Sequence, residues 1–162
     1  MPLPVGTAAP DFTVKTMTDA GAADFTLSDH IGQSNIVLLF FPGAFTHVCQ
    51  AEMCKMSNET DKYSNLNALV CGISVDTYYS QDAWAKQEKI TIPLLSDFKH
   101  EVTHAYDVVW PNFSGMGPAS ARAAFVINKQ GIIAYSEQCP TLLDQPDYEA
   151  IERCLSQLSS RP

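Results

Sequence analysis

The sequence predicts an α/β fold in which a central mixed β-sheet is flanked by helices. Residues 36–41 and 69–75 are two continuous apolar runs, which are typical of strands buried on both faces. A helical pattern follows each run, and such a crossover connects parallel strands. Further along, residues 123–128 and 132–136 are separated by Lys129-Gln130-Gly131 and predict an antiparallel hairpin. Parallel and antiparallel pairs together indicate a mixed sheet.

The segment before the first buried strand is expected to form an N-terminal extension of this fold. Residues 12–16 and 24–27 are short candidate strands on either side of the turn-rich residues 18–21. Residues 28–32 then predict a single helical turn.

The later elements follow from periodicity and from turn residues. Ser80 is the expected N-cap of the second helix, and Pro93 makes the strand that contains it short. Glycine and proline make residues 110–120 a long loop. In chain order we expect a helix at 46–66, a helix at 80–89, a strand at 92–95, a helix at 98–106 and a helix at 147–158. Two βα crossovers, a hairpin and a last helix describe a thioredoxin-like fold.

Size and charge limit the classes of function. The 162 residues suit one domain, residues 1–162. The net charge of -8, without a basic stripe, argues against nucleic acid and anionic membranes as partners. No membrane-spanning stretch or secretory signal is visible. Five cysteines, an odd number, are expected to be thiols in a reducing compartment, so we expect a cytoplasmic location.

Cys49 is the most informative residue, because it follows a strand and a turn and falls in the first turn of the predicted helix. Unpaired backbone N–H groups and the helix dipole favour negative charge there, so the thiolate, which is the nucleophilic form, is favoured. Thr46 is the expected N-cap. In that position its hydroxyl would accept a hydrogen bond from the Cys49 amide.

The pattern Pro-x-x-x-Thr-x-x-Cys, formed by Pro42, Thr46 and Cys49, resembles that of the peroxiredoxins. Residues 6–12, 93–97 and 122–127 resemble further segments of the family, and residues 40–52 are most similar to its alkyl hydroperoxide reductase E-like branch. The resemblance implies a thioredoxin-like thiol peroxidase that reduces hydrogen peroxide and organic hydroperoxides. It implies no metal and no organic cofactor.

The resemblance also implies roles for individual residues. Cys49 would attack the peroxide and become a sulfenic acid. Arg122 would bind the thiolate and the peroxide, Thr46 would bind the peroxide oxygen, and Pro42 would shield the site from water. Glu52 lies three residues after Cys49, on the same helix face, and would orient Arg122. A thioredoxin-like protein or a small thiol would be the reductant, and a homodimer is a family expectation.

Cys54 is the candidate for resolving the sulfenic acid. Four residues separate it from Cys49, a spacing that resembles the peroxiredoxin Q group. In an intact helix the two Cα atoms would be about 8 to 9 Å apart. A disulfide tolerates roughly 7 Å, so the helix would have to unwind. Cys139, Cys154 or an external thiol are the alternatives, whereas Cys71 lies in a buried strand and is expected to be a packing residue.

Two other functions compete with this one. Residues 100–104 match His-Glu-x-x-His, the pattern of a zinc enzyme, but lack the glycine and third histidine of its extended form. A redox sensor or holdase would use the same cysteine to signal. A thioredoxin-type oxidoreductase is less favoured, because it needs Cys-x-x-Cys, which the chain lacks.

Overall fold

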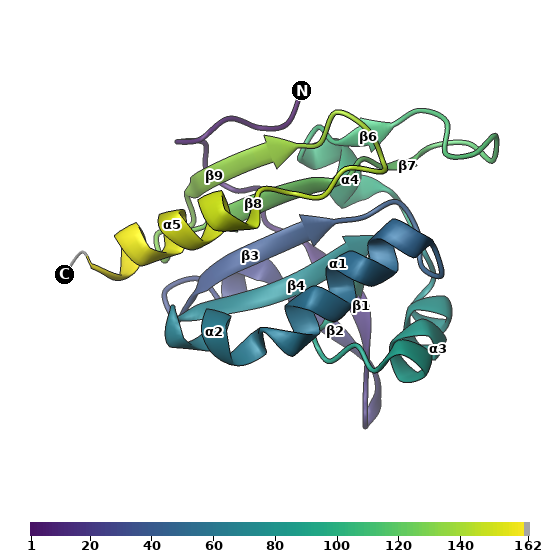
Figure 1. Cartoon of the computed structure of the whole chain (residues 1–162), viewed down its shortest axis with the longest axis horizontal. Helices are drawn as coiled ribbons and strands as arrows, with labels where there is room; N and C mark the ends of the chain where they lie inside the picture. The colour runs from purple at the N-terminus through teal and green to yellow at the C-terminus, as the bar shows by residue number, and fades with distance from the viewer. Residues whose placement is uncertain (161–162) are drawn as a thin grey trace.

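A mixed seven-stranded sheet is the centre of the computed structural model, which describes residues 1–160 (Figure 1). Its strand order is β2-β1-β5-β4-β3-β8-β9. The strands are β1 (Thr13–Thr18), β2 (Gly21–Thr26), β3 (Asn35–Phe40), β4 (Ala68–Ser74), β5 (Leu94–Ser96), β8 (Ala123–Ile127) and β9 (Ile133–Gln138).

The directions of the strands confirm the predicted mixed sheet. β3 and β5 both run parallel to β4, whereas β8 is antiparallel to β3 and β9 is antiparallel to β8. The β1–β2 hairpin pairs with β5 through β1 and forms one edge of the sheet. It is the N-terminal extension that the sequence indicated. The sheet and its helices together form the thioredoxin-like fold that the sequence predicted.

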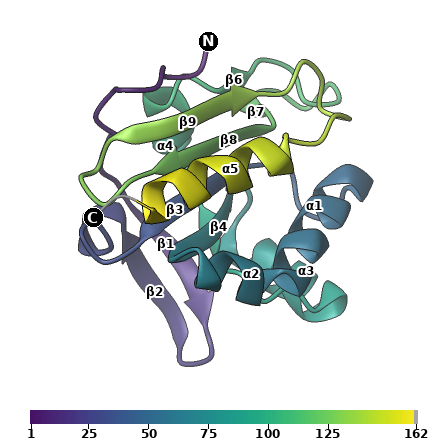
Figure 2. The same ribbon diagram turned by 60° about the vertical axis from the view of Figure 1, so that its left-hand side comes forward.

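Helices cover both faces of the sheet. The helices are α1 (His47–Asn58), α2 (Thr60–Asn65), α3 (Tyr78–Glu88), α4 (Glu101–Ala105) and α5 (Tyr148–Ser159), and a short 3-10 helix spans Leu27–Asp29. Figures 1 and 2 show α1, α2 and α5 in front of the sheet and α4 behind it. Within residues 1–160, none of the helices has both the length and the apolar character needed to cross a bilayer.

Two apolar clusters, one on each face, hold the layers together. Alternate residues of β3 enter opposite clusters, since Val37 and Leu39 join α1 and α5 while Ile36 and Leu38 pack with α4. This explains the continuous apolar run in the sequence, because both faces of the strand are buried.

Gly72 of β4 sets how closely α1 approaches the sheet. A Cβ atom at this position would lie 2.8 Å from the sulfur of Met53 and 2.9 Å from Cδ2 of Leu94. Real Cβ atoms do not come this close, so the missing side chain makes room for Met53. Helix α1, which carries Cys49 in its first turn, therefore packs directly on β4.

The helix predicted at 46–66 is interrupted. Glu59 leaves the helical region with φ −106° and ψ 17°, so α1 ends before it and α2 starts after it. The Thr60 hydroxyl donates to the carbonyl of Ser57 at 2.9 Å, and such local bonds compete with regular helix.

The expected cap of α3 was also wrong. Thr77, not Ser80, is the N-cap, and its hydroxyl accepts a hydrogen bond from the Ser80 amide at 3.2 Å. Both residues are good caps, and the extended backbone of Thr77 (φ −66°, ψ 152°) decides between them.

The helix predicted at 98–106 is shorter than expected. His100 has φ 62° and stands outside α4, and the buried Asp97 carboxylate accepts hydrogen bonds from the amides of Val102 and Thr103. In the predicted loop at 110–120, β6 (Val109–Trp110) pairs with β7 (Ala119–Ser120), so only the tip is irregular.

Candidate active site

Strand pairing brings Cys49 and Arg122 together although they are 73 positions apart in the sequence. The residues after β3 form the turn that leads into α1, and Cys49 lies in the first turn of that helix. β8 runs antiparallel to β3, and its first residue, Ala123, pairs with Phe40 at the end of β3. Arg122 therefore lies beside the point where the chain leaves the sheet for α1 (Figure 1).

The Arg122 guanidinium is the centre of this arrangement. Its Nη2 donates to Sγ of Cys49 at 3.1 Å and its Nη1 donates to Oε1 of Glu52 at 3.0 Å. Nε and Nη2 also donate to the carbonyl of Leu142, at 3.1 and 2.9 Å. Cys49 and Glu52 have no exposed surface, and Arg122 is 1% exposed. One planar cation thus binds a sulfur, a carboxylate and a loop carbonyl in a region that is closed to water.

Charge is tightly balanced in this buried group. Burial raises the pKa of Glu52 to about 7, although the attraction of Arg122 acts in the opposite direction. Its Oε2 atom has no hydrogen-bond partner. Burial lowers the pKa of Arg122, but the attraction of Cys49 and Glu52 outweighs this, so the net shift is upward. Near neutral pH a partly protonated Glu52 leaves much of the guanidinium charge to the sulfur.

The turn before α1 differs in one respect from the sequence expectation. Thr46 occupies the N-cap position, which makes Cys49 the third helical residue. Its hydroxyl does not bind the Cys49 amide, so that part of the expectation is wrong. It donates instead to the carbonyl of Gly43 at 2.7 Å and closes the turn on itself. Pro42 is buried, and Phe45 has the left-handed φ of 63°.

Sequence reasoning missed the segment 139–147, which closes the site from the other side. Its Leu142 carbonyl binds Arg122, and the side-chain amide of Gln145 donates to the carbonyl of Val48 at 3.3 Å. The amide of Cys139 donates to the carbonyl of Arg122 at 2.8 Å. No sequence signal points to this segment, because the carbonyl that Arg122 uses belongs to the backbone.

The cysteine sulfur is closed to solvent in this structure. Cys49 belongs to the apolar cluster that contains Val37, Leu39 and Met53, and only its contact with Arg122 is polar. The surroundings of the sulfur are therefore apolar except for the Arg122 guanidinium, and the sulfur has no surface that a solute could reach without a movement of the chain.

The other thiols are free and less suited to ionise. Burial raises the pKa of Cys71 to about 12, and burial followed by the charge of Glu137 does the same for Cys139. Burial also raises the pKa of Cys154 and, with the charge of Glu88, that of Cys54.

Cys54 is held on a different face of α1 from Cys49. Five residues rotate its side chain by about 140° around the helix axis. Its sulfur contacts the carbonyl of Glu88 at 3.8 Å, on the side of α3. The intact helix therefore keeps the two thiols apart.

The zinc pattern at residues 100–104 is not presented by a regular helix. His100 is the N-cap of α4 and has a left-handed backbone (φ 62°), so of the two histidines only His104 has helical geometry. Within residues 1–160, no three His, Cys, Asp or Glu side chains form a group that would hold a metal ion.

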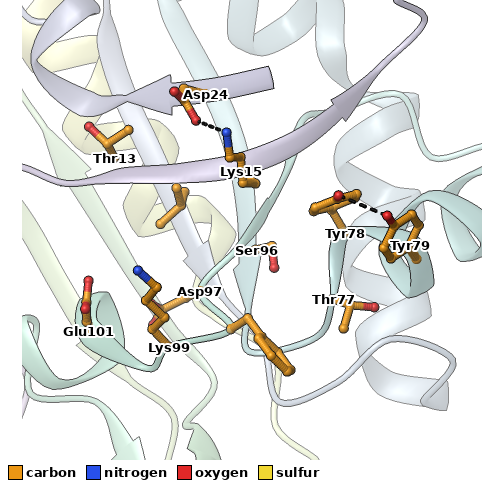
Figure 3. Close-up of a pocket in the computed structure, with 12 residues that line it drawn as sticks. Thr13, Lys15, Asp24, Thr77, Tyr78, Tyr79, Ser96, Asp97, Lys99 and Glu101 are labelled. Carbon is orange, nitrogen blue, oxygen red and sulfur yellow. Dashed lines mark hydrogen bonds and ion pairs between the residues drawn. The ribbon is translucent and has the colours of Figure 1, made fainter. Parts of the chain in front are cut away.

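A separate cavity of about 420 Å³ lies between β1, the start of α3 and the loop before α4. Figure 3 shows the Lys15–Asp24 ion pair and the hydrogen-bonded hydroxyls of Tyr78 and Tyr79 at this cavity. None of the residues around Arg122 lines it.

A buried thiol at a helix start, bound by an arginine in a thioredoxin-like fold, indicates thiol chemistry, and the chain resembles known proteins of that kind. Residues 5–136 match the AhpC/TSA family. The chloroplastic 2-cysteine peroxiredoxin of Chattonella marina var. antiqua is 34% identical over 143 residues, which cover 84% of this chain and 71% of that protein.

Two further comparisons agree with this one. Alkyl hydroperoxide reductase E of Mycobacterium bovis is 36% identical over 137 residues, which cover 83% of this chain and 85% of that protein. The crystal structure of reduced Plasmodium vivax 2-Cys peroxiredoxin has a TM-score of 0.85 and 27% identity, and covers 96% of this chain and 81% of that one. The chain belongs to the AhpC/TSA family and is a peroxiredoxin, an enzyme that reduces peroxides with a thiol.

The raised pKa of Glu52 predicts how stability depends on pH. Because the folded chain holds this proton up to about pH 7 and the unfolded chain loses it near 4.5, the wild type loses stability as pH rises through this interval. Glu52→Gln keeps an oxygen for Arg122 and cannot ionise. Urea unfolding should show the wild type losing about 3 kcal/mol relative to Glu52→Gln between these pH values. A difference that is constant with pH would contradict the shift.

Proposed function

We propose that Cys49 is the residue that reduces the peroxide and that Arg122 activates it. The observation that carries this proposal is the 3.1 Å hydrogen bond from the guanidinium to the sulfur, made in the first turn of α1. A guanidinium is always charged and the helix start favours negative charge, so both stabilise the thiolate. Among the five thiols, this is the one that faces a cation at hydrogen-bond distance.

The reaction is a substitution at oxygen. The thiolate attacks the terminal oxygen of a hydroperoxide, an S–O bond forms and the O–O bond breaks. Sulfur is oxidised to sulfenic acid, and the leaving alkoxide takes a proton and departs as an alcohol, or as water when the substrate is hydrogen peroxide. Negative charge moves from sulfur to the leaving oxygen, so a fixed cation next to both lowers the barrier.

Thr46 and Pro42 support this step. The only proton of the Thr46 hydroxyl is used on the Gly43 carbonyl, so its free lone pairs are left to accept the O–H of the peroxide. Such an acceptor orients the terminal oxygen toward the sulfur. Pro42, which is buried, has no N–H and excludes water from the turn. Glu52 fixes the plane of the guanidinium through Nη1.

Resolution requires a second thiol, and we propose Cys54 for it. Its thiol condenses with the sulfenic acid to give a disulfide and water. The first turns of α1 have to unwind for this, which also breaks the contact between Arg122 and the sulfur. A thioredoxin-like protein or a small thiol then reduces the disulfide. Cys139, Cys154 and an external thiol are the alternatives, and the pKa of Cys139 and of Cys154 is raised by burial.

We further propose that the chain forms a homodimer through the surface around the separate cavity. Tyr79 and Phe98 both line this cavity and are 68% and 64% exposed, which is unusual for large aromatic side chains at one site. Aromatic residues are enriched in the centres of protein interfaces. A cytoplasmic location, which would keep the five thiols reduced, remains part of the proposal.

Two substitutions test the chemistry. Cys49→Ser should abolish peroxide reduction, and Arg122→Lys should lower kcat/KM by about 100-fold, because lysine keeps the charge but cannot bind sulfur, carboxylate and carbonyl together. Stopped-flow peroxide consumption measures both, with Arg153→Lys as the control, because Arg153 is an exposed arginine on α5 that pairs with Glu149. Wild-type activity in Cys49→Ser would rule out the proposal, and slow turnover in the wild type would favour the redox-sensor role.

The resolving thiol is tested by mass spectrometry of the protein after one equivalent of peroxide. A Cys49–Cys54 disulfide should appear, and Cys54→Ser should instead accumulate the sulfenic acid and lose turnover with thioredoxin. If Cys54→Ser turns over normally, then Cys139, Cys154 or an external thiol resolves the intermediate, and Cys139→Ser and Cys154→Ser separate these.

Sedimentation velocity tests the dimer. Tyr79→Glu and Phe98→Glu place a charge in the proposed interface and should convert the dimer to a monomer. Leu143→Glu is the matched control, because Leu143 is 78% exposed but does not line the cavity. A wild type that sediments as a monomer at all concentrations, or a dimer that survives both substitutions, would contradict this interface.

A further inference from the structure

We infer that Asp76 is a positioning residue for peroxide reduction, because its carboxylate holds the turn 42–46 in the shape that presents Thr46 and Cys49. The inference rests on the proposed roles of these two residues. Asp76 follows β4, the parallel neighbour of β3, so the ends of both strands meet at the turn. Its Oδ2 accepts a hydrogen bond from the backbone amide of Ala44 at 2.8 Å.

The turn needs an external support because its backbone is strained. Phe45 has φ 63°, a left-handed conformation that is costly for a residue with a Cβ atom. The Phe45 side chain is 52% exposed, and its ring centroid lies 6.4 Å from that of Trp84. The Thr46–Gly43 hydrogen bond lies within the turn and does not fix its position in the protein. The bond from Ala44 to Asp76 joins the turn to the next strand.

Asp76 is itself held from both sides. Oδ2 also accepts from the hydroxyl of Ser74 at 2.7 Å, and the hydroxyl of Ser96 donates to the Asp76 carbonyl at 2.6 Å. The Ser74 hydroxyl accepts from Nε2 of Gln81, which is 1% exposed and also donates to the carbonyl of Leu95 at 2.8 Å. A chain of hydrogen bonds therefore connects β5 and α3 to the turn.

Figure 3 shows how this support ends at the surface. Ser96 and Thr77, which lies next to Asp76, are both drawn on the wall of the separate cavity. The Asp76 carboxylate binds the amide of Ala44, and its carbonyl binds the hydroxyl of Ser96. Asp76 thus connects a residue of the cavity wall to the active-site turn.

The position of the turn matters because the reaction depends on geometry. The Thr46 hydroxyl has to meet the peroxide while the sulfur remains in line with the O–O bond, and a displacement of about 1 Å costs on the order of 100-fold in rate. A hydrogen bond from an amide to a carboxylate is stronger than one between neutral groups, so it suits this role. Asp76 does not need to touch the peroxide to affect the rate.

The test separates positioning from a general effect on the fold. Asp76→Ala removes the acceptor of Ala44, and Asp76→Asn keeps an oxygen in the same place. The rate of Cys49 oxidation by peroxide, measured by rapid quench and mass spectrometry, should fall at least tenfold in Asp76→Ala and return to within about threefold of wild type in Asp76→Asn. Alkylation of Cys49 by iodoacetamide should not slow, since the guanidinium contact is intact. Asp82→Ala is the control, an acidic residue on α3 that contacts Lys86.

Two outcomes would overturn the inference. One is an Asp76→Ala enzyme that reacts with peroxide at the wild-type rate. The other is a parallel loss of peroxide reduction, alkylation and unfolding midpoint that Asp76→Asn does not restore, because this would mean that Asp76 acts on the fold as a whole. Failure of the proposed function is seen separately, as peroxide reduction that persists in Cys49→Ser.

Discussion

The contact between the Arg122 guanidinium and the Cys49 sulfur is the constraint around which the site is built. A cation and a thiol are placed where no water reaches either of them. Removing a charged group from water costs several kcal/mol, and only partners with good geometry offset this. Arg122 has such partners in Cys49, Glu52 and the carbonyl of Leu142. Arg122 makes all of these hydrogen bonds only when the sheet, the first turn of α1 and segment 139–147 are in place.

This arrangement couples chemistry to conformation. The closed site excludes water and strengthens the electrostatic contact, but it also keeps out the peroxide. Two segments border the site: the turn 42–46, which the Ala44 amide joins to Asp76, and segment 139–147, which contacts Arg122 and Val48. In the proposed chemistry, oxidation to the sulfenic acid changes the group that Arg122 binds, and a disulfide with Cys54 requires the first turns of α1 to unwind.

Much of this protein could be predicted from its sequence, and the limits have physical causes. The buried strands and the position of Cys49 followed from local pattern, and the contacts of Arg122 with Cys49 and Glu52 are those that the family resemblance implied. The direction of the Thr46 hydroxyl could not be predicted, because this hydroxyl can either accept from the Cys49 amide or donate to the Gly43 carbonyl, and the backbone of the turn decides.

Contacts made by the backbone left no signal in the sequence, and the break after the first helix left only a weak one. The Leu142 carbonyl would bind Arg122 whatever its side chain, whereas Ser57, Asn58 and Thr60 around Glu59 lower the helix propensity without fixing where the helix ends. The supporting role of Asp76 depends on β3 and β4 ending side by side, which is a property of the strand register.

The glycine in β4 has a consequence that reaches the chemistry. Met53, which fills the space above Gly72, lies one helical turn after Cys49 on the same rigid helix. A methyl group at Gly72 would meet the ends of the Met53 and Leu94 side chains, so these side chains would have to move. A residue that carries no chemistry of its own therefore shapes the packing between the sheet and the helix that carries Cys49.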